Sequence, residues 1–337
     1  MTSPTPLKFL MPGWFSLVMG LSGLSLAWHR ASAVLGDMAD GIALVVGGLA
    51  ALVFVVLLVA SALRFARYPV ALEEDLKHPV RHAFVAALPV ATLLMAAVGV
   101  ALFGPHPLLN AVWWVGALTQ LWATVWVLGR WLAPVPSASP GQTGLWPGVT
   151  PVLLIPVVGN VVSPLAGLPL GHEVWATAQM GIGTFFWPIV MGMVLVRRIA
   201  HSPLPDRILP AWFITIAPPA VIGSVLTQYE APLALSLGMW GIAAFILVWL
   251  APLAGRIAGQ PFGVAFWGLS FPLAALATLN LRLAELQGDA ALQTVGMLLL
   301  AVASIVILWL GFATVRGLRD GSLLAPEPIA SIQPVAA

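Results

Sequence analysis

Ten apolar stretches, each long enough to cross a bilayer, follow one another along this chain. A helix of about 20 apolar residues spans a hydrocarbon core of roughly 30 Å. Of the 337 residues, 60% are hydrophobic and 8% are charged, and short connections separate the stretches. We therefore expect an all-α polytopic membrane protein with one transmembrane domain over residues 13–315. Its predicted spans are 13–31, 41–63, 82–103, 108–131, 148–169, 174–196, 208–228, 232–254, 263–285 and 291–315.

Charged residues avoid the middle of every stretch. Pumps that couple to protons or sodium usually place an ionisable group at mid-membrane, where it is costly to bury. A membrane-embedded enzyme would need several ionisable residues at one depth, and the sequence contains no such cluster. We expect a pathway built from neutral groups, with no catalytic residues and no enzyme activity.

Metal and cofactor sites find little support in the sequence. The chain has no cysteine, which excludes disulfides and thiolate metal sites. His78 and His82 have the i, i+4 spacing of a helical ligand pair, but Pro79 between them fits a helix start better and no third ligand is assured. We expect no metal and no cofactor. The net charge of +2 is too small to argue for nucleic acid as a partner.

The positive charges predict the orientation in the membrane. Cytoplasmic loops carry an excess of Lys and Arg, and an even number of spans puts both termini on one side. If both tails, 1–12 and 316–337, are cytoplasmic, Arg30 and Arg282 are the only two of the 14 Lys and Arg residues on the outer side. We expect a multi-pass protein of the inner (plasma) membrane in this orientation. The charge-rich stretch 64–81 is expected to be a solvated cytoplasmic connector. The inner set is Lys8, Arg64, Arg67, Lys77, Arg81, Arg130, Arg197, Arg198, Arg207, Arg256, Arg316 and Arg319.

Helix-disturbing residues are concentrated in the odd-numbered stretches, whereas the even-numbered ones are mostly smooth. A proline inside a helix removes one backbone hydrogen bond, and in lipid the freed carbonyl needs protein or cavity water as its partner. This favours five helical hairpins in which odd helices form an inner ring and even helices face lipid. The alternative is that proline is simply common in membrane helices. The residues are Gly13, Gly20, Gly23, Pro89, Pro151, Pro156, Gly159, Pro164, Pro218, Pro219, Gly268 and Pro272.

The ninth stretch contains a candidate gate. Phe271 directly precedes Pro272 near mid-membrane, and a run of small residues follows. The missing N–H of Pro272 makes the helix locally soft, and a hydrophobic constriction can close a narrow pore by dewetting. The alternative is that this aromatic ring only contributes to packing.

Three groups of short motifs resemble the tellurite-resistance/dicarboxylate transporter (TDT) family, most closely its bacterial TehA-like branch, which is related to the plant guard-cell slow anion channels. The likeness covers nearly the whole chain in the number and order of spans. The motifs are Pro12-Gly13-Trp14-Phe15-Ser16-Leu17-Val18-Met19-Gly20 with Ala27-Trp28; His78-Pro79-Val80 with Phe84 and Leu88-Pro89; and Gln260-Pro261-Phe262 with Phe266-Trp267, Ser270-Phe271 and Ala277-Thr278.

The resemblance implies ten helices in a quasi-fivefold arrangement, a central pore lined by the odd helices, and a homotrimer. It implies passive permeation of small inorganic anions past a phenylalanine on the ninth helix. That gate corresponds to Phe271, with Phe266 as the second choice. Other pore positions implied by it are Phe15, Met19, Phe84, Leu88 and Pro218.

Two further sets of residues follow from the sequence itself. Arg30 and Arg282 could edge an outer vestibule and attract anions; alternatively, Arg282 and Glu285 form a surface ion pair of little energetic weight. Small polar groups in the inner stretches could replace part of an anion's hydration shell. These groups are Ser16, Ser22, Asn160, Ser163 and Thr215.

We expect an anion-selective channel for chloride and nitrate. The alternative is a secondary carrier that exports oxyanions or dicarboxylates such as tellurite, sulfite or malate. Alternating-access carriers usually show two-fold repeats around a midplane site, and five hairpins do not divide in that way.

Overall fold

The computed structural model describes residues 6–132, 146–200 and 204–325, and all of their regular secondary structure is helical. Eight helical stretches are long and apolar enough to cross a membrane. The protein is therefore a multi-pass helical membrane protein. The eight stretches are Asp37–Arg67 (α2), Arg81–Phe103 (η3 and α4), Pro107–Leu132 (α5), Glu173–Ala200 (α8), Asp206–Gln228 (η7 and α9), Leu233–Leu250 (α10), Val264–Gln287 (η8 and α12) and Ala290–Arg319 (α13).

The other two predicted spans have different forms. The first is η2 (Pro12–Phe15) followed by α1 (Ser16–Leu35). The fifth is broken into η5 (Pro151–Leu153), α6 (Leu154–Val158), η6 (Gly159–Val162) and α7 (Pro164–Gly167), because its prolines interrupt the helical hydrogen bonds. Short elements complete the fold: η1 (Pro6–Phe9), α3 (Pro69–Lys77), η4 (Trp146–Gly148) and α11 (Leu253–Ala258).

Burial divides the long helices into two classes. In the stretches that contain α4, α9 and α12, 72%, 83% and 78% of the most apolar window is buried. The corresponding share is between 22% and 39% for α2, α5, α8, α10 and α13. Among these eight stretches, the three odd-numbered ones are therefore mostly buried and the five even-numbered ones are mostly exposed.

The inner stretches share a local design: each begins with a tight 3-10 segment, labelled η, and continues as an α-helix. Four of these segments end three residues before a proline, at Pro89, Pro156, Pro219 and Pro272. A proline cannot donate to the carbonyl four residues earlier, so the preceding turn tightens to i→i−3 bonds. The sequence thus produces the same break in four different spans.

Tryptophan side chains tie the outer helices to the inner stretches. Each donates its indole N–H across the layer boundary, which satisfies a polar group that lipid could not. The four bonds are Trp28 to Ser304 Oγ (3.1 Å), Trp113 to the Ser163 carbonyl (2.9 Å), Trp240 to Asn280 Oδ1 (2.8 Å) and Trp267 to Thr314 Oγ1 (3.0 Å).

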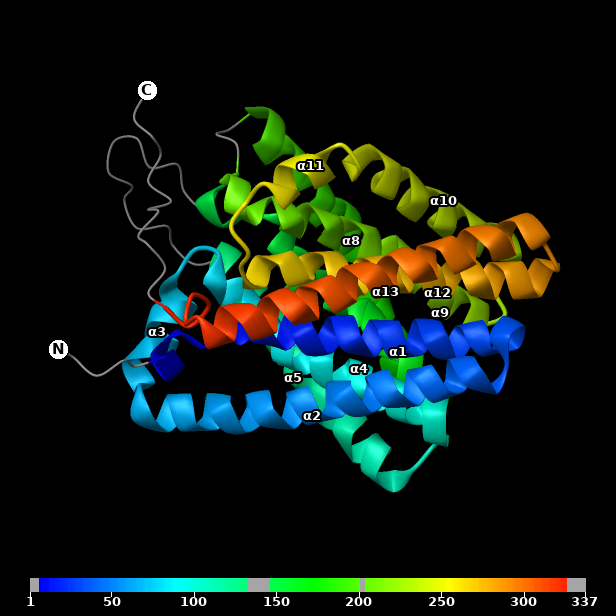
Figure 1. Cartoon of the computed structure of the whole chain (residues 1–337), viewed down its shortest axis with the longest axis horizontal. Helices are drawn as coiled ribbons and strands as arrows, with labels where there is room; N and C mark the ends of the chain where they lie inside the picture. Colours follow the sequence, from blue (N-terminus) through cyan, green and yellow to red (C-terminus); the bar gives the residue numbers. More distant parts are fainter. Residues whose placement is uncertain (1–5, 133–145, 201–203, 326–337) are drawn as a thin grey trace.

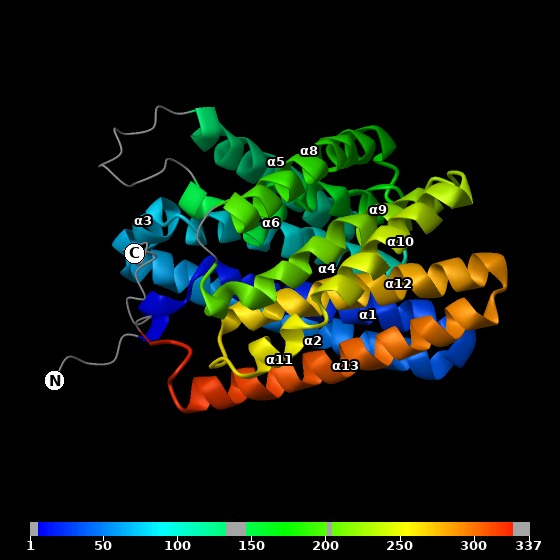
Figure 2. The same ribbon diagram turned by 90° about the horizontal axis from the view of Figure 1, so that it is seen from above.

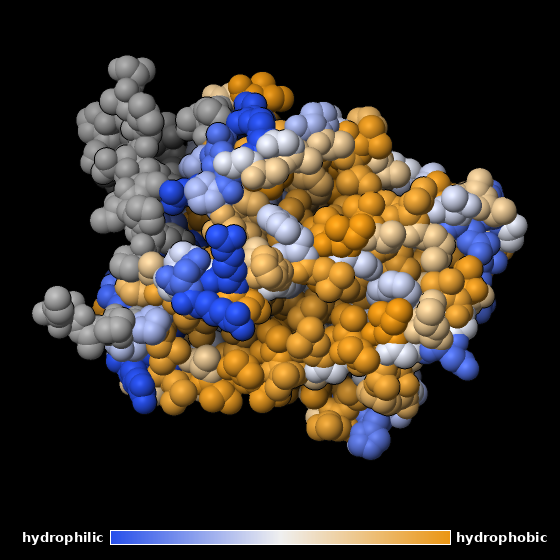
Figure 3. Space-filling view, viewed as in Figure 1, coloured by the Kyte–Doolittle hydropathy of each residue, from blue (hydrophilic) through white to orange (hydrophobic). Residues whose placement is uncertain are grey.

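The helices run mainly along the long axis of the molecule, and η1 and the end of α13 lie at the same end of the bundle (Figures 1 and 2). Hydrophobic side chains cover most of the flank in view, while hydrophilic ones gather toward its two ends (Figure 3). Helix α13 continues to Arg319, four residues past the predicted span, and much of the predicted tails lies outside the described residues.

Candidate functional site

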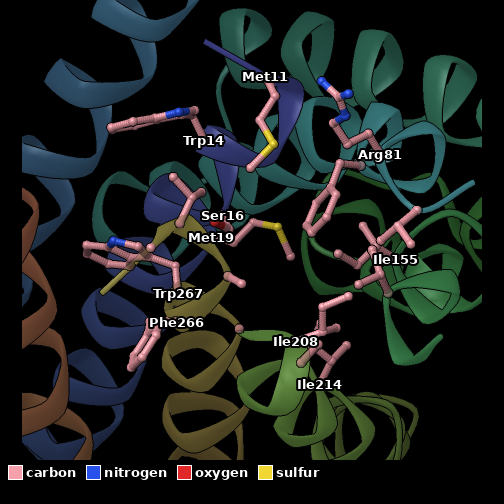
Figure 4. A pocket seen from close by; sticks show the side chains of 18 of the residues that line it. Met11, Trp14, Ser16, Met19, Arg81, Ile155, Ile208, Ile214, Phe266 and Trp267 are labelled. Atoms are coloured by element: carbon pink, nitrogen blue, oxygen red, sulfur yellow. The ribbon is translucent and has the colours of Figure 1, made fainter. Parts of the chain in front are cut away.

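One cavity of about 620 Å³ lies among the inner stretches. All five contribute to its wall, each through its 3-10 segment and the first turns of the helix that follows. In Figure 4, Met19 projects into this space, Trp267 and Phe266 lie on one side, and Ile155, Ile208 and Ile214 lie on the other. The shared 3-10 design therefore places five equivalent segments around one space; we call it the central cavity.

Charge on the wall of the central cavity is confined to one end. The charged lining residues come from η1, the end of α2, α3 and the starts of η3 and η7, the same end as the last residues of α13 (Figure 1). Further in, the described lining is uncharged and mostly apolar, with the Ser16 hydroxyl and the indole rings of Trp14 and Trp267 among its members. We call the charged end the basic mouth; its ionisable residues are Lys8, Arg64, Glu74, Asp75, His78, Arg81 and Arg207.

Phe271 and Pro272 are the last residues of their stretch among the described residues that line the cavity. Phe271 is buried, and its ring lies against α1 at Gly23, where an added Cβ would approach Phe271 Cδ2 to 2.9 Å. Phe266 also lines the cavity, but its ring belongs to an aromatic cluster with Phe262 (5.3 Å between centroids) and Trp309 (5.9 Å). Of the two candidate gates, Phe271 lies further along its stretch, at the end of the part that lines the cavity.

Six of the residues expected along the pathway line the central cavity: Ser16, Met19, Phe84, Pro218, Phe266 and Phe271. Phe84 lies against the bare backbone of Gly13, where an added Cβ would come within 3.2 Å of its ring. Phe15, Leu88, Asn160, Ser163 and Thr215 are not among the described lining residues. Phe15 instead packs edge-on against Phe54 of α2, with 6.0 Å between the ring centroids.

The polar groups expected to contact anions are mostly engaged with the protein. The hydroxyls of Ser16 and Thr215 each donate to a carbonyl three residues earlier, at 2.7 Å, and so complete the tight turns of η2 and η7. The Ser22 hydroxyl is directed toward Met95 Sδ, 3.5 Å away. The hydroxyls of Ser16 and Thr215 stabilise the 3-10 segments because they cover carbonyls that the broken helices leave free.

Asn160 belongs to a buried amide network on the outer side of the fifth stretch. Its Nδ2 donates to Thr124 Oγ1 (2.7 Å) and to the Val157 carbonyl (3.2 Å). Gln120 Nε2 donates to the carbonyl of Pro156 at 3.1 Å, and Gln179 Nε2 donates to the carbonyl of Ala117 at 2.7 Å. The network therefore supplies partners for the broken backbone of residues 151–167, where lipid would offer none.

At the opposite end of the molecule, Arg30 and Arg282 share one carboxylate. Glu285 Oε2 lies 3.2 Å from Arg30 Nη1 and 2.9 Å from Arg282 Nη1. All three side chains are partly exposed, and the trio joins the ends of α1 and α12. The arginines therefore keep a net positive charge at this end, although neither lines the central cavity.

The connector 64–81 is not simply solvated, contrary to the sequence-based expectation. Arg64 and Asp75 are buried, at 2% and 0% exposure, and Arg64 Nη2 lies 2.7 Å from Asp75 Oδ2. Arg81 Nη1 lies 3.1 Å from Asp75 Oδ1. Asp75 shares the inner face of α3 with the buried Ala71, four residues earlier, whereas Glu73 and Glu74 are exposed. The i, i+4 spacing of Ala71 and Asp75 is the sequence feature that could have predicted a buried carboxylate within the acidic run.

His78 holds the turn between α3 and η3. Its Nδ1 accepts hydrogen bonds from the backbone N–H groups of Val80 and Arg81, both at 3.1 Å. Partial burial, followed by the charge of Arg81, lowers the pKa of His78 below its ordinary value of 6.5, against a smaller opposing effect of Asp75. The imidazole therefore stays neutral at physiological pH, with its Nε2 carrying the proton.

Comparison with known proteins assigns the chain to a family. The family described as "Voltage-dependent anion channel" (SLAC1) matches residues 10–315, which is nearly the whole described chain. The chain belongs to this family. Among similar proteins, the Tellurite resistance protein TehA homolog of Haemophilus influenzae is 27% identical over 327 residues, covering 95% of this chain and 93% of its own length.

Plant S-type anion channels are also similar to this chain. The S-type anion channel SLAH2 of Arabidopsis thaliana is 22% identical over 78% of this chain, and the Guard cell S-type anion channel SLAC1 of the same plant is 24% identical over 81%. The chain spans about half the length of these relatives, 50% and 49% respectively. Membership of the family supports anion transport through a multi-pass membrane protein.

Proposed function

We propose that this protein is an anion-selective channel in which small monovalent anions such as chloride and nitrate permeate passively through the central cavity past a Phe271 gate. The observation that carries the proposal is the cavity itself: residues from five stretches surround it, its described interior wall is uncharged, and the described lining of the ninth stretch ends at Phe271 and Pro272. A cavity without charged residues in its described interior would bind anions only weakly, which suits their conduction better than their tight binding.

The absence of charge among the described interior lining residues favours fast exit. An arginine fixed inside the cavity would bind an anion tightly, whereas conduction requires weak binding. Selectivity would then come from the dehydration energy of the anion and from pore width, with positive charge only at the two ends. The Phe271 ring would close the path by excluding water from the narrowest point.

The proposal includes an architecture and an orientation. Ten spans form five hairpins around the cavity, and the basic mouth faces the cytoplasm because its four cations, Lys8, Arg64, Arg81 and Arg207, all belong to the set that the positive-inside rule assigns to that side. Both tails are then cytoplasmic, and the protein resides in the inner membrane as a homotrimer, as the family resemblance implies. Exposed apolar side chains on α2, α5, α8, α10 and α13 would contact lipid or neighbouring protomers.

The alternative remains a coupled carrier of oxyanions or dicarboxylates, since one relative carries "tellurite resistance" in its name. Anion flux into liposomes that contain the purified protein separates the two mechanisms. A channel gives flux that rises with anion concentration without early saturation and needs no counter-ion gradient. Flux that saturates and depends on a proton or cation gradient would replace the channel with the carrier.

The variant Phe271→Ala assigns the gate in the same liposomes. Its flux should exceed that of the wild-type protein, because alanine no longer fills the end of the cavity. Phe266→Ala is the matched control, since it removes the other lining phenylalanine from the same stretch. A larger increase with Phe266→Ala would move the gate to Phe266.

A further inference from the structure

The ion triad Arg64–Asp75–Arg81 lies on the wall of the central cavity at its basic mouth. The carboxylate of Asp75 is fully buried and contacts both guanidinium groups. Two arginines share one carboxylate, so the triad carries a net charge of about +1. A buried charge normally needs a complete set of partners, and this triad leaves one cation in excess.

Arg64 anchors the triad rather than facing the path. Its Nε donates to the Lys8 carbonyl at 2.9 Å, its Nη2 donates to the Ala71 carbonyl at 3.3 Å, and its side chain is 3% exposed. Asp75 is thereby fixed on the inner face of α3. The buried pair forms a rigid base to which Arg81 attaches.

Arg81 is the member of the triad that reaches the open space. Its side chain is 31% exposed, and Figure 4 shows its guanidinium at the rim of the cavity. Asp75 holds only Nη1, and the buried Nε has no hydrogen-bond partner within the described structure. A guanidinium that is bonded through only one of its nitrogens keeps N–H donors for a further acceptor. Its positive charge is only partly neutralised, because Arg64 and Arg81 share the single carboxylate of Asp75.

The surroundings of Arg81 favour a negative ligand. The described residues that line the basic mouth include Lys8 and Arg207 besides the two triad arginines, against the carboxylates of Glu74 and Asp75. His78, on the same wall, is neutral because its Nδ1 accepts backbone hydrogen bonds. A cleft with this excess of one sign concentrates counter-ions and accelerates their entry.

We propose that Arg81, held in place by the buried Arg64–Asp75 pair, is a binding site for small inorganic anions at the basic mouth and determines how fast they enter the central cavity. This inference rests on the proposed channel function. The site binds anions weakly, because a single, partly exposed guanidinium holds the anion. The anion can therefore dissociate from it into the uncharged interior of the cavity. Small monovalent anions such as chloride and nitrate are the chemical class that fits, because the described lining beyond the mouth offers no charged partner.

The test measures anion current in planar bilayers. The parent protein carries Phe271→Ala, and each further substitution is added singly to this parent. At about 0.01 M salt the Debye length is roughly 30 Å and the charge of Arg81 acts at full range, whereas at about 1 M it is roughly 3 Å and the charge is screened. Arg81→Gln should lower anion current entering from the basic mouth by about tenfold at low salt, and far less at high salt. Arg81→Lys should retain most of the current, since it keeps the charge.

Arg198→Gln is the matched control. It removes the same charge from the same end of the molecule, and Arg198 lies in a separate groove between α8 and α10 rather than in the central cavity. Its current should match the background at both salt concentrations. Equal behaviour of Arg81→Gln and Arg198→Gln would overturn the proposal.

Chloride-35 NMR line broadening of the purified protein in detergent provides a readout that does not need conduction. Broadening that nitrate displaces should be present in the parent and in Arg198→Gln, and reduced in Arg81→Gln. If the Phe271→Ala background carries no current but this pattern appears, the channel function fails and the anion site stands. If Arg81→Gln broadens the line as strongly as the parent, the site itself is refuted.

Discussion

The ring of Phe271 on α12 packs against the bare backbone of Gly23 on α1. A Cβ at Gly23 would stand 2.9 Å from Phe271 Cδ2, closer than real Cβ atoms approach a neighbour. The same helix contacts η8 and α12 one turn earlier, where Gly20 faces Ser270 and Trp267. Helix α1 thus forms the seat of the proposed gate, and its glycines are needed because the rings occupy the space of their missing side chains.

The first prediction concerns this seat. Gly23→Ala should destabilise the protein by about 1–3 kcal/mol through overpacking, and by much less when Phe271 is also changed to Ala. The measurement is a double-mutant cycle on thermal unfolding of the purified protein in detergent. Gly181→Ala is the control, because an added Cβ there meets nothing within 4 Å. Equal losses from Gly23→Ala in both backgrounds would show that the ring does not occupy this space.

A second prediction concerns the buried ion pair. Arg64→Met leaves the carboxylate of Asp75 buried with only Arg81 as its counter-charge, and should cost about 3–5 kcal/mol. The double change Arg64→Met with Asp75→Asn should cost less than the two single changes added together. Arg67→Met, three residues further along α2 and exposed, should change stability by no more than about 0.5 kcal/mol. Additive losses in the double variant would contradict the pairing.

The third prediction concerns pH. A histidine whose pKa is lower in the folded protein gains protons on unfolding, so its contribution to stability is present above pH 6.5 and is lost as the pH falls below it. His78→Asn keeps a side-chain acceptor for the N–H groups of Val80 and Arg81 but cannot titrate. Melting temperatures measured between pH 8 and pH 5 should fall less for His78→Asn than for the wild-type protein. Parallel curves for the two proteins would exclude His78 as the source.

The fourth prediction separates the amide network from the pathway. Asn160→Ala should destabilise the protein by about 1–3 kcal/mol, because it leaves buried partners such as Thr124 and Gln179 incompletely bonded. It should leave the nitrate-to-chloride permeability ratio of the Phe271→Ala variant unchanged, since Asn160 is absent from the described lining of the cavity. Reversal potentials in mixed salts provide the ratio. A changed ratio would bring the Asn160 side chain back into the pathway.

The sequence predicts the outline of the fold because its strongest signals are physical necessities. Apolar length locates the eight long helices. Proline content is higher in the buried stretches, since a broken helix in lipid must find its partners inside the protein, and Pro188 inside the exposed α8 is the clear exception. The fifth stretch shows the limit of this reasoning. Its prolines indicate a break, but they do not reveal that Gln120 and Thr124 on α5 supply the missing hydrogen bonds.

Side-chain direction was harder to predict than burial. Phe15 and Ser16 are neighbours in one motif, yet Ser16 lines the cavity and Phe15 contacts α2. The directions of these two side chains depend on the 3-10 geometry of η2, in which each residue turns by a different angle than in an α-helix. The buried Arg64–Asp75 pair was missed for a related reason: a charge-rich loop is usually solvated, and only the register of α3 turns one carboxylate inward.

We propose above that Phe271 closes an anion-conducting path. The most direct test is the current of the wild-type protein and of Phe271→Ala in planar bilayers, under a chloride gradient with an impermeant cation. We predict a small wild-type current and a much larger mutant current that reverses at the chloride equilibrium potential. A folded, incorporated Phe271→Ala protein that passes no more current than wild type, or a current that reverses away from that potential, would contradict the account.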